Sequence, residues 1–505
     1  MKPNNFIALL ALTALTGLAS ACSGKLTHVG DYHSGEKKGT EIVSVQSASD
    51  MAAVTNSEKG FVDILDLSDP TAPRRKARYD LMLAEGEELT SVALHPEWNL
   101  FAAGVRSGSV RGPGRLILGL PSSGAIVKEL PTGFHPDCVE FDPTGNFLVV
   151  ANEGEDFDFD AGSKTFNSPP GSITVVDLRG GIATASVIDV PLPDVAGIEG
   201  MPTVDDKRFL ERPIDINGDG VISGEMDFDG DGEITKKKMV SLGTIDYVEV
   251  RGREDKGEEE IMVPIANGRA KFLEPEYVAF SPDGMTAYVT LQENNAIAVV
   301  NLPEATVERI FGLGTTTHMA DLIDEEDKDK PVKISFTQSL TAFREPDGLA
   351  VSPNGKWIFT ADEGDTEPKA AKTPEDLPKG GGRTMSVFDA ATGMLLGDTG
   401  NQIDEAAHAA GVYPDGRSDS KGSEPETVIA FERRGVTMAI VALERASALA
   451  LVEIKDPAKP MVVEVAALPK GSKAPEGIAL YYKGNKLYVL CANEKSGDLS
   501  VFEMN

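Results

Sequence analysis

Acidic residues recur at two equivalent positions of a repeated sequence pattern. The first set stands directly before an apolar run, in most copies just after a proline: Asp137, Glu276, Asp347, Glu426 and Glu476, with Glu41 as a weaker sixth. The second set follows the next apolar run of the same copies: Glu153, Glu155, Glu293, Glu363, Asp365, Glu444 and Glu494. Carboxylates gathered in such numbers repel one another unless they are protonated, paired or bridged by a cation. Hard oxygen ligands suit calcium or magnesium, so the pattern predicts a site for a divalent cation or a ligand.

Two other interpretations of these acids stay open. Arg106 and Arg445 occupy equivalent loops, and they could neutralise neighbouring carboxylates or contact an anionic substrate. The Pro-Glu pairs could also begin strands and accept hydrogen bonds from neighbouring repeats. On the cation hypothesis, the ligands come from ten residues: Asp137, Glu153, Glu155, Glu276, Glu293, Asp347, Glu363, Glu426, Glu476 and Glu494.

A second constellation has the spacing of calcium loops. Its candidate ligands are Asp215, Asn217 and Asp219 in one loop, and Asp227, Asp229, Asp231 and Glu233 in the next. Acids at alternate positions followed by glycine let the side chains turn inward around one cation. Both loops lack the bidentate glutamate at position twelve, where Met226 and Lys238 stand. The loops therefore resemble those of dockerins or thrombospondin repeats and not EF-hands. Calcium is the predicted cofactor, another divalent cation is the alternative, and a solvated acidic turn is the structural interpretation.

Signatures of enzymes are otherwise sparse. The sequence has no Walker-type phosphate loop, no zinc-protease helix motif and no GxSxG nucleophile elbow. The six histidines leave little room for a histidine-based metal centre, and His135 and His318 are the two that could act as ligands. No catalytic residue is assigned from the sequence.

Short strands must position these residues. Each copy contains β-branched or aromatic runs separated by Asp-Gly, Asn-Gly or similar turns, which predicts four-stranded antiparallel meanders. Such meanders are the blades of a β-propeller. Five clear copies and two weaker ones, from Glu41 and Leu89, give seven blades, while six or eight stay open because inserts blur the middle. The expected fold is therefore all-β, a single seven-bladed β-propeller with loop insertions.

The ends of the repeat array predict how the ring closes. The final copy has three strands before Asn505, and the segment Leu26–Gly35 could supply its outer strand. Closure in this way removes exposed sheet edges. In a blade, the start of the innermost strand and the loop between the second and third strands lie on the same face. The two sets of acids are thus expected to converge on one rim.

Four polar segments interrupt or link the copies. The longest, 193–271, carries the calcium-type loops, and shorter ones lie near 156–170, 366–382 and 401–422. Glycine, proline and charge dominate them, as in surface loops on a rigid scaffold. The expected organisation is a signal peptide at 1–21 and one propeller domain at 22–505, with 193–271 as an insert.

The first residues are typical of an export signal. Lys2 precedes an apolar run from Phe6 to Leu18, which is too short to span a membrane as a helix. Small residues then lead to Cys22 in a pattern that resembles a lipobox, so Cys22 is expected to carry lipid; ordinary cleavage near Ala21 is the alternative. Ser23 favours the outer membrane, and secretion without an anchor remains the other outcome. No other apolar run approaches about 18 residues, so the lipid is the only expected membrane contact.

The net charge narrows the class of partner. Lysine and arginine number 48 against 80 aspartates and glutamates, a formal net charge of −32. This field repels nucleic acid and anionic lipid and favours divalent cations or basic partners. The 41% hydrophobic content indicates a folded core and not a disordered acidic chain. Cys138 and Cys491 lie in different repeats, which disfavours a disulfide between them.

Several strings resemble a known family. They are ANEGE (151–155), GSITVVDL (171–178), the run from EPEYVAF to AVVNL (274–302), and the run from APEGIAL to SVFEM (474–504). Over nearly the whole mature chain the sequence resembles the choice-of-anchor I family of YVTN-type propellers, which are similar to mesenchyme-specific cell-surface glycoproteins. The resemblance implies an exported, surface-associated propeller. Some relatives are described as atypical alkaline phosphatases and others as calcium-associated surface proteins, and no agreed catalytic residues come with it. The calcium-type insert is a departure from the family.

Two functions remain as hypotheses. The first is a monomeric, lipid-tethered binding protein that holds calcium and presents an acidic face to a mineral, a polysaccharide or another surface partner. The second is a metal-dependent phosphoesterase that acts on a phosphorylated small molecule through carboxylate-held cations. Acids grouped around shared cations would favour the second, whereas acids spread singly around the rim would favour the first.

Overall fold

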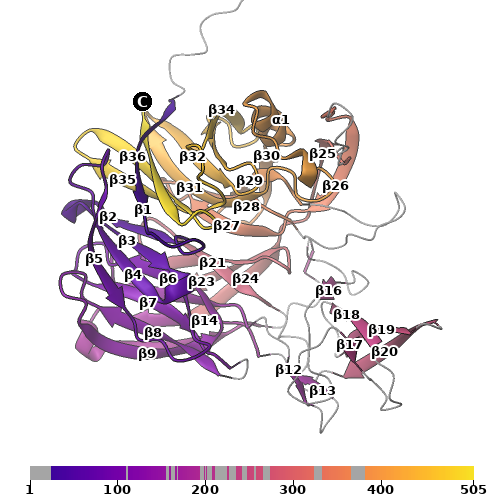
Figure 1. Ribbon diagram of the computed structural model, residues 1–505, viewed down its shortest axis with the longest axis horizontal. Coiled ribbons are helices and arrows are strands. Elements are labelled where there is room, and N and C mark those ends of the chain that lie inside the picture. The colour runs from indigo at the N-terminus through magenta and orange to yellow at the C-terminus, as the bar shows by residue number, and fades with distance from the viewer. Residues whose placement is uncertain are drawn as a thin grey trace, which may run out of the picture.

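The computed structural model describes residues 24–109, 112–154, 169–193, 198, 199, 201, 273–323, 333–364 and 381–505, together with the backbone of strands between 158 and 264. Seven four-stranded antiparallel sheets surround a common centre, as Figure 1 shows. The chain is a seven-bladed β-propeller, so the predicted fold class is confirmed.

Each blade runs from an inner strand to an outer strand. Blades 1 to 4 consist of these strands: β2 (Val43–Gln46), β3 (Met51–Asn56), β4 (Phe61–Asp66), β5 (Arg74–Asp80); β6 (Glu88–Leu94), β7 (Phe101–Arg106), β8 (Pro113–Gly119), β9 (Ile126–Phe134); β10 (Pro136–Phe141), β11 (Phe147–Asn152), β14 (Ser172–Asp177), β15 (Ser186–Pro191); β21 (Pro275–Phe280), β22 (Thr286–Leu291), β23 (Ala296–Asn301), β24 (Thr306–Gly312). Blades 5 to 7 consist of these: β27 (Pro346–Val351), β28 (Trp357–Asp362), β29 (Thr384–Asp389), β30 (Leu395–Asp398); β31 (Pro425–Arg433), β32 (Val436–Leu443), β33 (Ala448–Ile454), β34 (Met461–Ala467); β35 (Pro475–Lys483), β36 (Lys486–Asn493), β37 (Asp498–Met504) and β1 (Leu26–His33).

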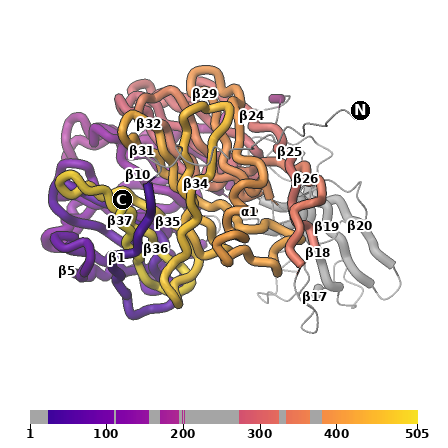
Figure 2. Tube along the Cα trace, turned by 90° about the horizontal axis from the view of Figure 1, so that it is seen from above, coloured from indigo at the N-terminus to yellow at the C-terminus, as the bar shows by residue number. Residues whose placement is uncertain are grey.

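The first described strand closes the ring. β1 pairs antiparallel with β37, from Leu26 opposite Met504 to His33 opposite Asp498, and is the outer strand of blade 7. Figure 2 shows β1 running beside β37 near the C-terminus. Leu26 is 3% exposed and packs into the apolar cluster between blades 6 and 7. The closure predicted for Leu26–Gly35 is therefore confirmed.

Apolar clusters between neighbouring blades form the core. Each of the seven interfaces, including the one between blades 7 and 1, encloses such a cluster. Third strands such as β33 are buried along their whole length, because neighbouring blades cover both faces of each sheet. This explains why they are continuous apolar runs, whereas outer strands such as β5 are largely exposed.

Tight turns join the first strand to the second in three central blades. Gly145, Gly284 and Gly355 occupy equivalent positions with φ of 72°, 68° and 70°. Glycine adopts this left-handed conformation without a steric penalty. The turn signals in the sequence therefore mark real hairpins.

Two polar segments contain more regular structure than expected. The stretch 401–422 forms α1 (Gln402–Ala409), whose Ile403 and Ala407 are fully buried against blades 5 and 6. Apolar residues four positions apart lie on one helical face, and this short signal was hidden among polar neighbours. A hairpin of β25 (Thr315–Ala320) and β26 (Gln338–Phe343) stands at the outside of the ring between blades 4 and 5 (Figures 1 and 2).

The long inserts also contain strands, so their assignment as loops was incomplete. β16 (Arg208–Leu210), β17 (Glu225–Met226), β18 (Thr235–Ser241), β19 (Tyr247–Glu254) and β20 (Gly257–Pro264) form one sheet. β12 (Asp158–Asp160) pairs with β13 (Thr165–Asn167). Cys138 and Cys491 are free thiols. No described helix is both long enough and apolar enough to cross a membrane.

The pairing of β1 with β37, which we call the clasp, predicts that substitutions at two adjacent residues of β1 differ in their cost to stability. Leu26→Ala should lower the free energy of unfolding by about 2–5 kcal/mol, because it removes a buried leucine at the ring closure. Thr27→Ala changes an exposed neighbour whose hydroxyl accepts a hydrogen bond from Asn505 at 2.9 Å, and it should cost no more than about 1 kcal/mol. Denaturant unfolding measures both, and equal costs would contradict the role of β1 in closure.

Candidate functional site

The predicted acids at the start of the inner strands lie in backbone bulges. In five blades the pairing of the first two strands skips two residues after the proline, and the acid is the first of them. The bulges lie between Pro136 and Val139, Pro275 and Val278, Pro346 and Leu349, Pro425 and Val428, and Pro475 and Ile478. Bulges redirect side chains and often occur beside functional sites. A cavity of about 790 Å³ is lined by all five acids and by Glu41.

The second set of acids converges on the same face. The Glu153 amide donates to the His135 carbonyl at 2.9 Å, and the amides of Glu444 and Glu494 donate to the residues before Pro425 and Pro475 at 2.9 and 2.8 Å. The loop after the second strand is thus tied to the start of the first strand in each of these blades. The predicted convergence is confirmed for the described members of the two sets, which do not include Glu155 and Asp365, and we call these acids the acidic rim.

The residue before the proline has an unusual backbone conformation in four blades. His135, Glu345, Glu424 and Ala474 have φ of 48°, 38°, 60° and 59°. Non-glycine residues rarely adopt positive φ, and a residue before proline is normally extended. Backbone strain of this kind clusters at functional sites. At His135 and Glu424 the strained residue also carries a side chain that reaches the rim.

Burial raises the pKa of the rim carboxyls. Glu276, Asp347, Glu426 and Glu476 have pKa values well above their usual range, first through loss of solvation and then through the charges of neighbouring carboxylates. Burial raises the pKa of Asp137 to about 6, while His135 opposes the shift. Each group is electrostatically linked to acids of another blade, so the rim behaves as one coupled set.

Among the described residues, lysine and arginine side chains pair with rim acids on one side of the rim. Lys421 pairs with Glu363, and Arg445 lies 2.7 Å from Glu424 and 2.5 Å from Glu444. Lys495 is also 2.5 Å from Glu444. Arg106 lies 3.3 Å from Glu88 in blade 2, so both arginines of the equivalent loops do neutralise carboxylates.

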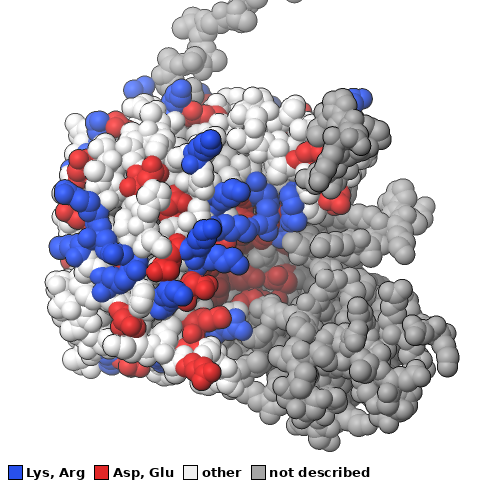
Figure 3. Space-filling model, in the orientation of Figure 1, with Lys and Arg blue, Asp and Glu red and all other residues white. Residues whose placement is uncertain are grey.

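The side of the rim that belongs to blades 3 and 4 has acidic side chains without basic partners among the described residues. Among the described residues, no lysine or arginine forms an ion pair with Asp137, Glu276 or Glu293. Figure 3 shows acidic side chains in a hollow near the middle of the face, with basic side chains along one side of it. Glu293 instead acts on Glu276, and after burial its charge is the largest cause of the raised Glu276 pKa. This side of the rim needs protons or a cation to balance its charge.

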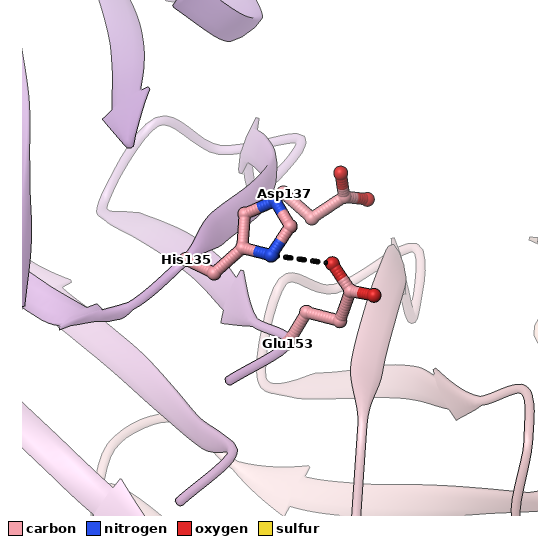
Figure 4. Close-up of side chains that lie close together, drawn as sticks. All are labelled: His135, Asp137 and Glu153. Carbon is pink, nitrogen blue, oxygen red and sulfur yellow. Dashed lines mark ion pairs between the residues drawn. The ribbon is translucent and has the colours of Figure 1, made fainter. Parts of the chain in front are cut away.

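Three groups of side chains are compact enough to hold a metal ion. The ligand atoms lie within 4.8 Å of one another in each of these groups: His135, Asp137 and Glu153; Glu363, Glu424 and Glu426; Glu426, Glu444 and Glu476. The first, which we call the mixed cluster, is drawn in Figure 4. The other two, which we call the linked clusters, share Glu426. Oε2 of Glu276 and Oε2 of Glu426 are buried and receive no hydrogen bond from any described residue.

The predicted site residues are distributed among these groups and the neighbouring cavities as follows. Asp137 and Glu153 meet in the mixed cluster, while Glu363, Glu426 and Glu476 belong to the linked clusters. Glu276 and Glu293 form a separate pair, and Asp347 lines the cavity between them and blade 6. Glu494 lies with Glu41 at a neighbouring cavity of about 710 Å³.

Several predictions fall outside the described residues. These are Glu155, the loop ligands Asp215, Asn217, Asp219, Asp227, Asp229, Asp231 and Glu233, and the lipidation site Cys22.

Sequence reasoning missed four contributors. Glu424, Lys421 and Lys495 were not identified, and His135 was noted without being assigned as a ligand. For Glu424 and His135, the signal was the residue type directly before a proline that precedes an acid. Lys421 lies in a polar linker, and nothing in its local sequence indicates that it reaches Glu363.

The burial of Glu140 beside the cavity predicts that the stability of the fold depends on pH. This residue of β10 lines the cavity, and burial raises its pKa from 4.5 to about 8. The folded state therefore binds more protons than the unfolded state between these values, and stability falls as pH rises through this window. Without divalent cations, Glu140→Gln should melt with wild type near pH 4 and at least about 2 °C higher near pH 9.

Scanning calorimetry at both pH values tests this expectation. Glu432→Gln is the matched control, because Glu432 is exposed near the end of β31 and should follow wild type throughout. A Glu140→Gln difference that is the same at both pH values would contradict the assignment.

Comparison with solved structures agrees with the fold. A chain of the mitotic checkpoint complex is similar with a TM-score of 0.50 at 10% identity, covering 99% of this chain and 98% of that one. The β-propeller domain of Cps50 (Swd1) from Myceliophteria thermophila has a TM-score of 0.48 at 9% identity, with 95% and 100% covered. Hydrazine synthase from Kuenenia stuttgartiensis has a TM-score of 0.48 at 10% identity, with 94% and 99% covered. Likeness at these identities concerns the fold only.

Sequence comparison identifies the family. No curated protein matches the chain. The choice-of-anchor I domain matches residues 41–208, 214–377 and 368–457, which together span most of the propeller. The chain therefore belongs to the choice-of-anchor I domain family, as its sequence motifs indicated.

Proposed function

We propose that this surface-associated propeller binds calcium at its acidic rim and presents the occupied rim to a partner at the cell surface. Family membership indicates a cell-surface or exported protein. The signal-like first 21 residues and Cys22 support a lipid anchor as the means of attachment. The calcium-type loops between Asp215 and Glu233 would add further sites of the same kind.

The linked clusters are the observation that carries this proposal. Glu426 belongs to both, and its buried Oε2 receives no hydrogen bond from a described residue. An ionised carboxylate in such a place is costly unless a proton or a cation neutralises it. Oxygen donors suit calcium, and binding of the ion would displace protons from groups whose pKa is raised.

The geometry also leaves room for a partner. Calcium takes six to eight oxygen ligands, and three glutamates supply only part of that number. The remaining positions can be filled by water or by oxygens of a bound molecule. An anionic partner such as a mineral surface or an acidic polysaccharide would supply them, and the bound calcium would offset the repulsion from the acidic protein.

Calcium binding at the rim predicts a change in stoichiometry on mutation. Glu426→Gln removes a ligand common to both linked clusters, so isothermal titration should show at least one calcium fewer per chain than in wild type. Ligand excess should stabilise wild type by about 2.7 kcal/mol at one hundred times the Kd. Glu432→Gln, an exposed change on the same strand, is the control.

A second variant distinguishes calcium bound at the rim from calcium bound in the loops of the insert. Asp219→Asn with Asp231→Asn removes loop ligands and should leave the rim calcium in place. Unchanged calcium stoichiometry in Glu426→Gln, together with full loss in the loop variant, would assign calcium to the insert and refute the rim site.

A metal-dependent phosphoesterase is the second candidate function, and the shared Glu426 favours it. Two clusters with a common carboxylate are the arrangement in which two cations can be held close enough to act on one phosphate. Arg445 and Lys495 lie beside these clusters and could contact the anionic group. The acids are thus grouped around shared points and not spread singly around the rim.

The enzyme hypothesis predicts calcium-dependent hydrolysis of a generic phosphomonoester. Turnover should disappear with chelator and should fall at least about 100-fold in Glu426→Gln, because both linked clusters would lose their common carboxylate. Glu432→Gln should keep wild-type activity. Absence of turnover in calcium-loaded wild type would leave the binding function as the proposal.

A further inference from the structure

One of the three clusters differs chemically from the other two. Within the described part of the chain, only the mixed cluster combines a nitrogen donor, from His135, with the carboxylates of Asp137 and Glu153. The linked clusters contain oxygen donors only. Imidazole suits zinc, copper, iron and nickel, whereas carboxylates with no nitrogen suit calcium, magnesium or manganese. The rim therefore has two kinds of donor set.

The geometry of the mixed cluster fits a small ion. Nδ1 of His135 lies 2.8 Å from Oε2 of Glu153. One ring nitrogen of His135 and one carboxylate oxygen each of Asp137 and Glu153 lie within 4.8 Å of one another. Ligands of a zinc-sized ion lie at about 2.0–2.2 Å, which places adjacent ligands of a tetrahedral site roughly 3.3–3.6 Å apart. Figure 4 shows both carboxylates on the same side of the imidazole ring. A small cation can therefore replace the direct contact between His135 and Glu153 with little movement.

The backbone holds these donors in place before any ion binds. His135 is kept at φ of 48° directly before Pro136, and its carbonyl accepts the Glu153 amide at 2.9 Å. The Gly154 amide donates to the Phe134 carbonyl at 3.2 Å. The two chain segments that carry the ligands are thus joined at the site, which is the rigidity that a metal centre requires.

An independent observation beside the cluster also points to a cation. Glu276 is only 7% exposed, and its Oε2 receives no hydrogen bond from any described residue. It lines the same cavity as Asp137 and Glu153, and the charge of Glu153 acts on it directly. No described lysine or arginine forms an ion pair with Glu276 or Asp137. Glu276 is thus a further unneutralised carboxylate beside the mixed cluster, although it is outside the group of ligand atoms that lie within 4.8 Å of one another.

We infer that His135, Asp137 and Glu153 form a transition-metal site of the zinc, iron or cobalt class, separate from the calcium positions of the rim. The negative charge of Glu276 would favour a cation there, and the open mouth of the cavity leaves at least one position for water or a ligand oxygen. This inference deepens the proposed cation-binding function and rests on the same rim, but it assigns a different ion to blade 3.

Cobalt(II) is a suitable probe, because its visible absorption reports the ligands directly. The purified protein is first saturated with calcium and then titrated with cobalt. We expect one cobalt per chain that excess calcium does not displace, and an X-ray absorption spectrum with the scattering of a single imidazole. The wild-type spectrum tests the inference even if a variant fails to fold.

Variants then locate the site. His135→Asn should weaken cobalt binding at least tenfold and leave the calcium stoichiometry unchanged, whereas Glu476→Gln should weaken calcium binding and leave cobalt unchanged. His33→Asn, an exposed histidine at the end of β1, is the control and should bind both ions as wild type.

The outcomes separate this inference from the calcium proposal. Cobalt that is displaced by calcium, that shows no imidazole ligand, or that binds His135→Asn as tightly as wild type overturns the transition-metal site. Cobalt binding at His135 in a protein without rim calcium would retain this inference and refute the calcium function.

Discussion

The constraint on which the site depends is that the carboxyl groups lose solvation at the mouth of the central cavity. A ring of blades necessarily brings the starts of its inner strands together, and here five of those starts carry a carboxyl group. Water would stabilise each charge separately, but the converging blades exclude much of it, so the pKa values of Glu276, Asp347, Glu426 and Glu476 rise together. The rim is therefore a set of groups whose charge must be balanced by something other than solvent.

The chain balances that charge in two ways. On the side of blades 5 to 7, Lys421, Arg445 and Lys495 supply fixed positive charges, which leave the linked clusters partly neutralised. On the side of blades 3 and 4, the described residues supply no such charge to Asp137 or Glu276. A bound metal ion would be stabilised more strongly there, because it does not compete with the positive charge of a lysine or arginine side chain. This asymmetry is the physical basis for proposing different ions on the two sides.

The sequence was sufficient for the fold because the fold repeats. The repeated β-branched and aromatic runs and their glycine turns predicted four-stranded blades, although the number of blades stayed open between six and eight. The pairing of β1 with β37 was expected from the three-stranded last copy. The convergence of the acids also followed from blade geometry. Which acids share a cluster did not follow, since that depends on how each bulge turns its side chain across the gap to another blade. Glu424 and Lys421 show the limit most clearly: one is a strained residue before a proline and the other lies in a linker, and neither has a periodic pattern around it.

The clasp between β1 and β37 has a consequence for how the protein reaches its final state. The partners are the first and last described strands, so blade 7 cannot be completed until the whole chain is available. Until then, β1 and β37 each present an unpaired edge, which is a template for pairing with other chains. Contacts between the two ends of a chain form slowly, because a very long loop must close. Assembly is thus expected to be limited by this last step, and the nascent chain is expected to need protection from aggregation until its ends meet.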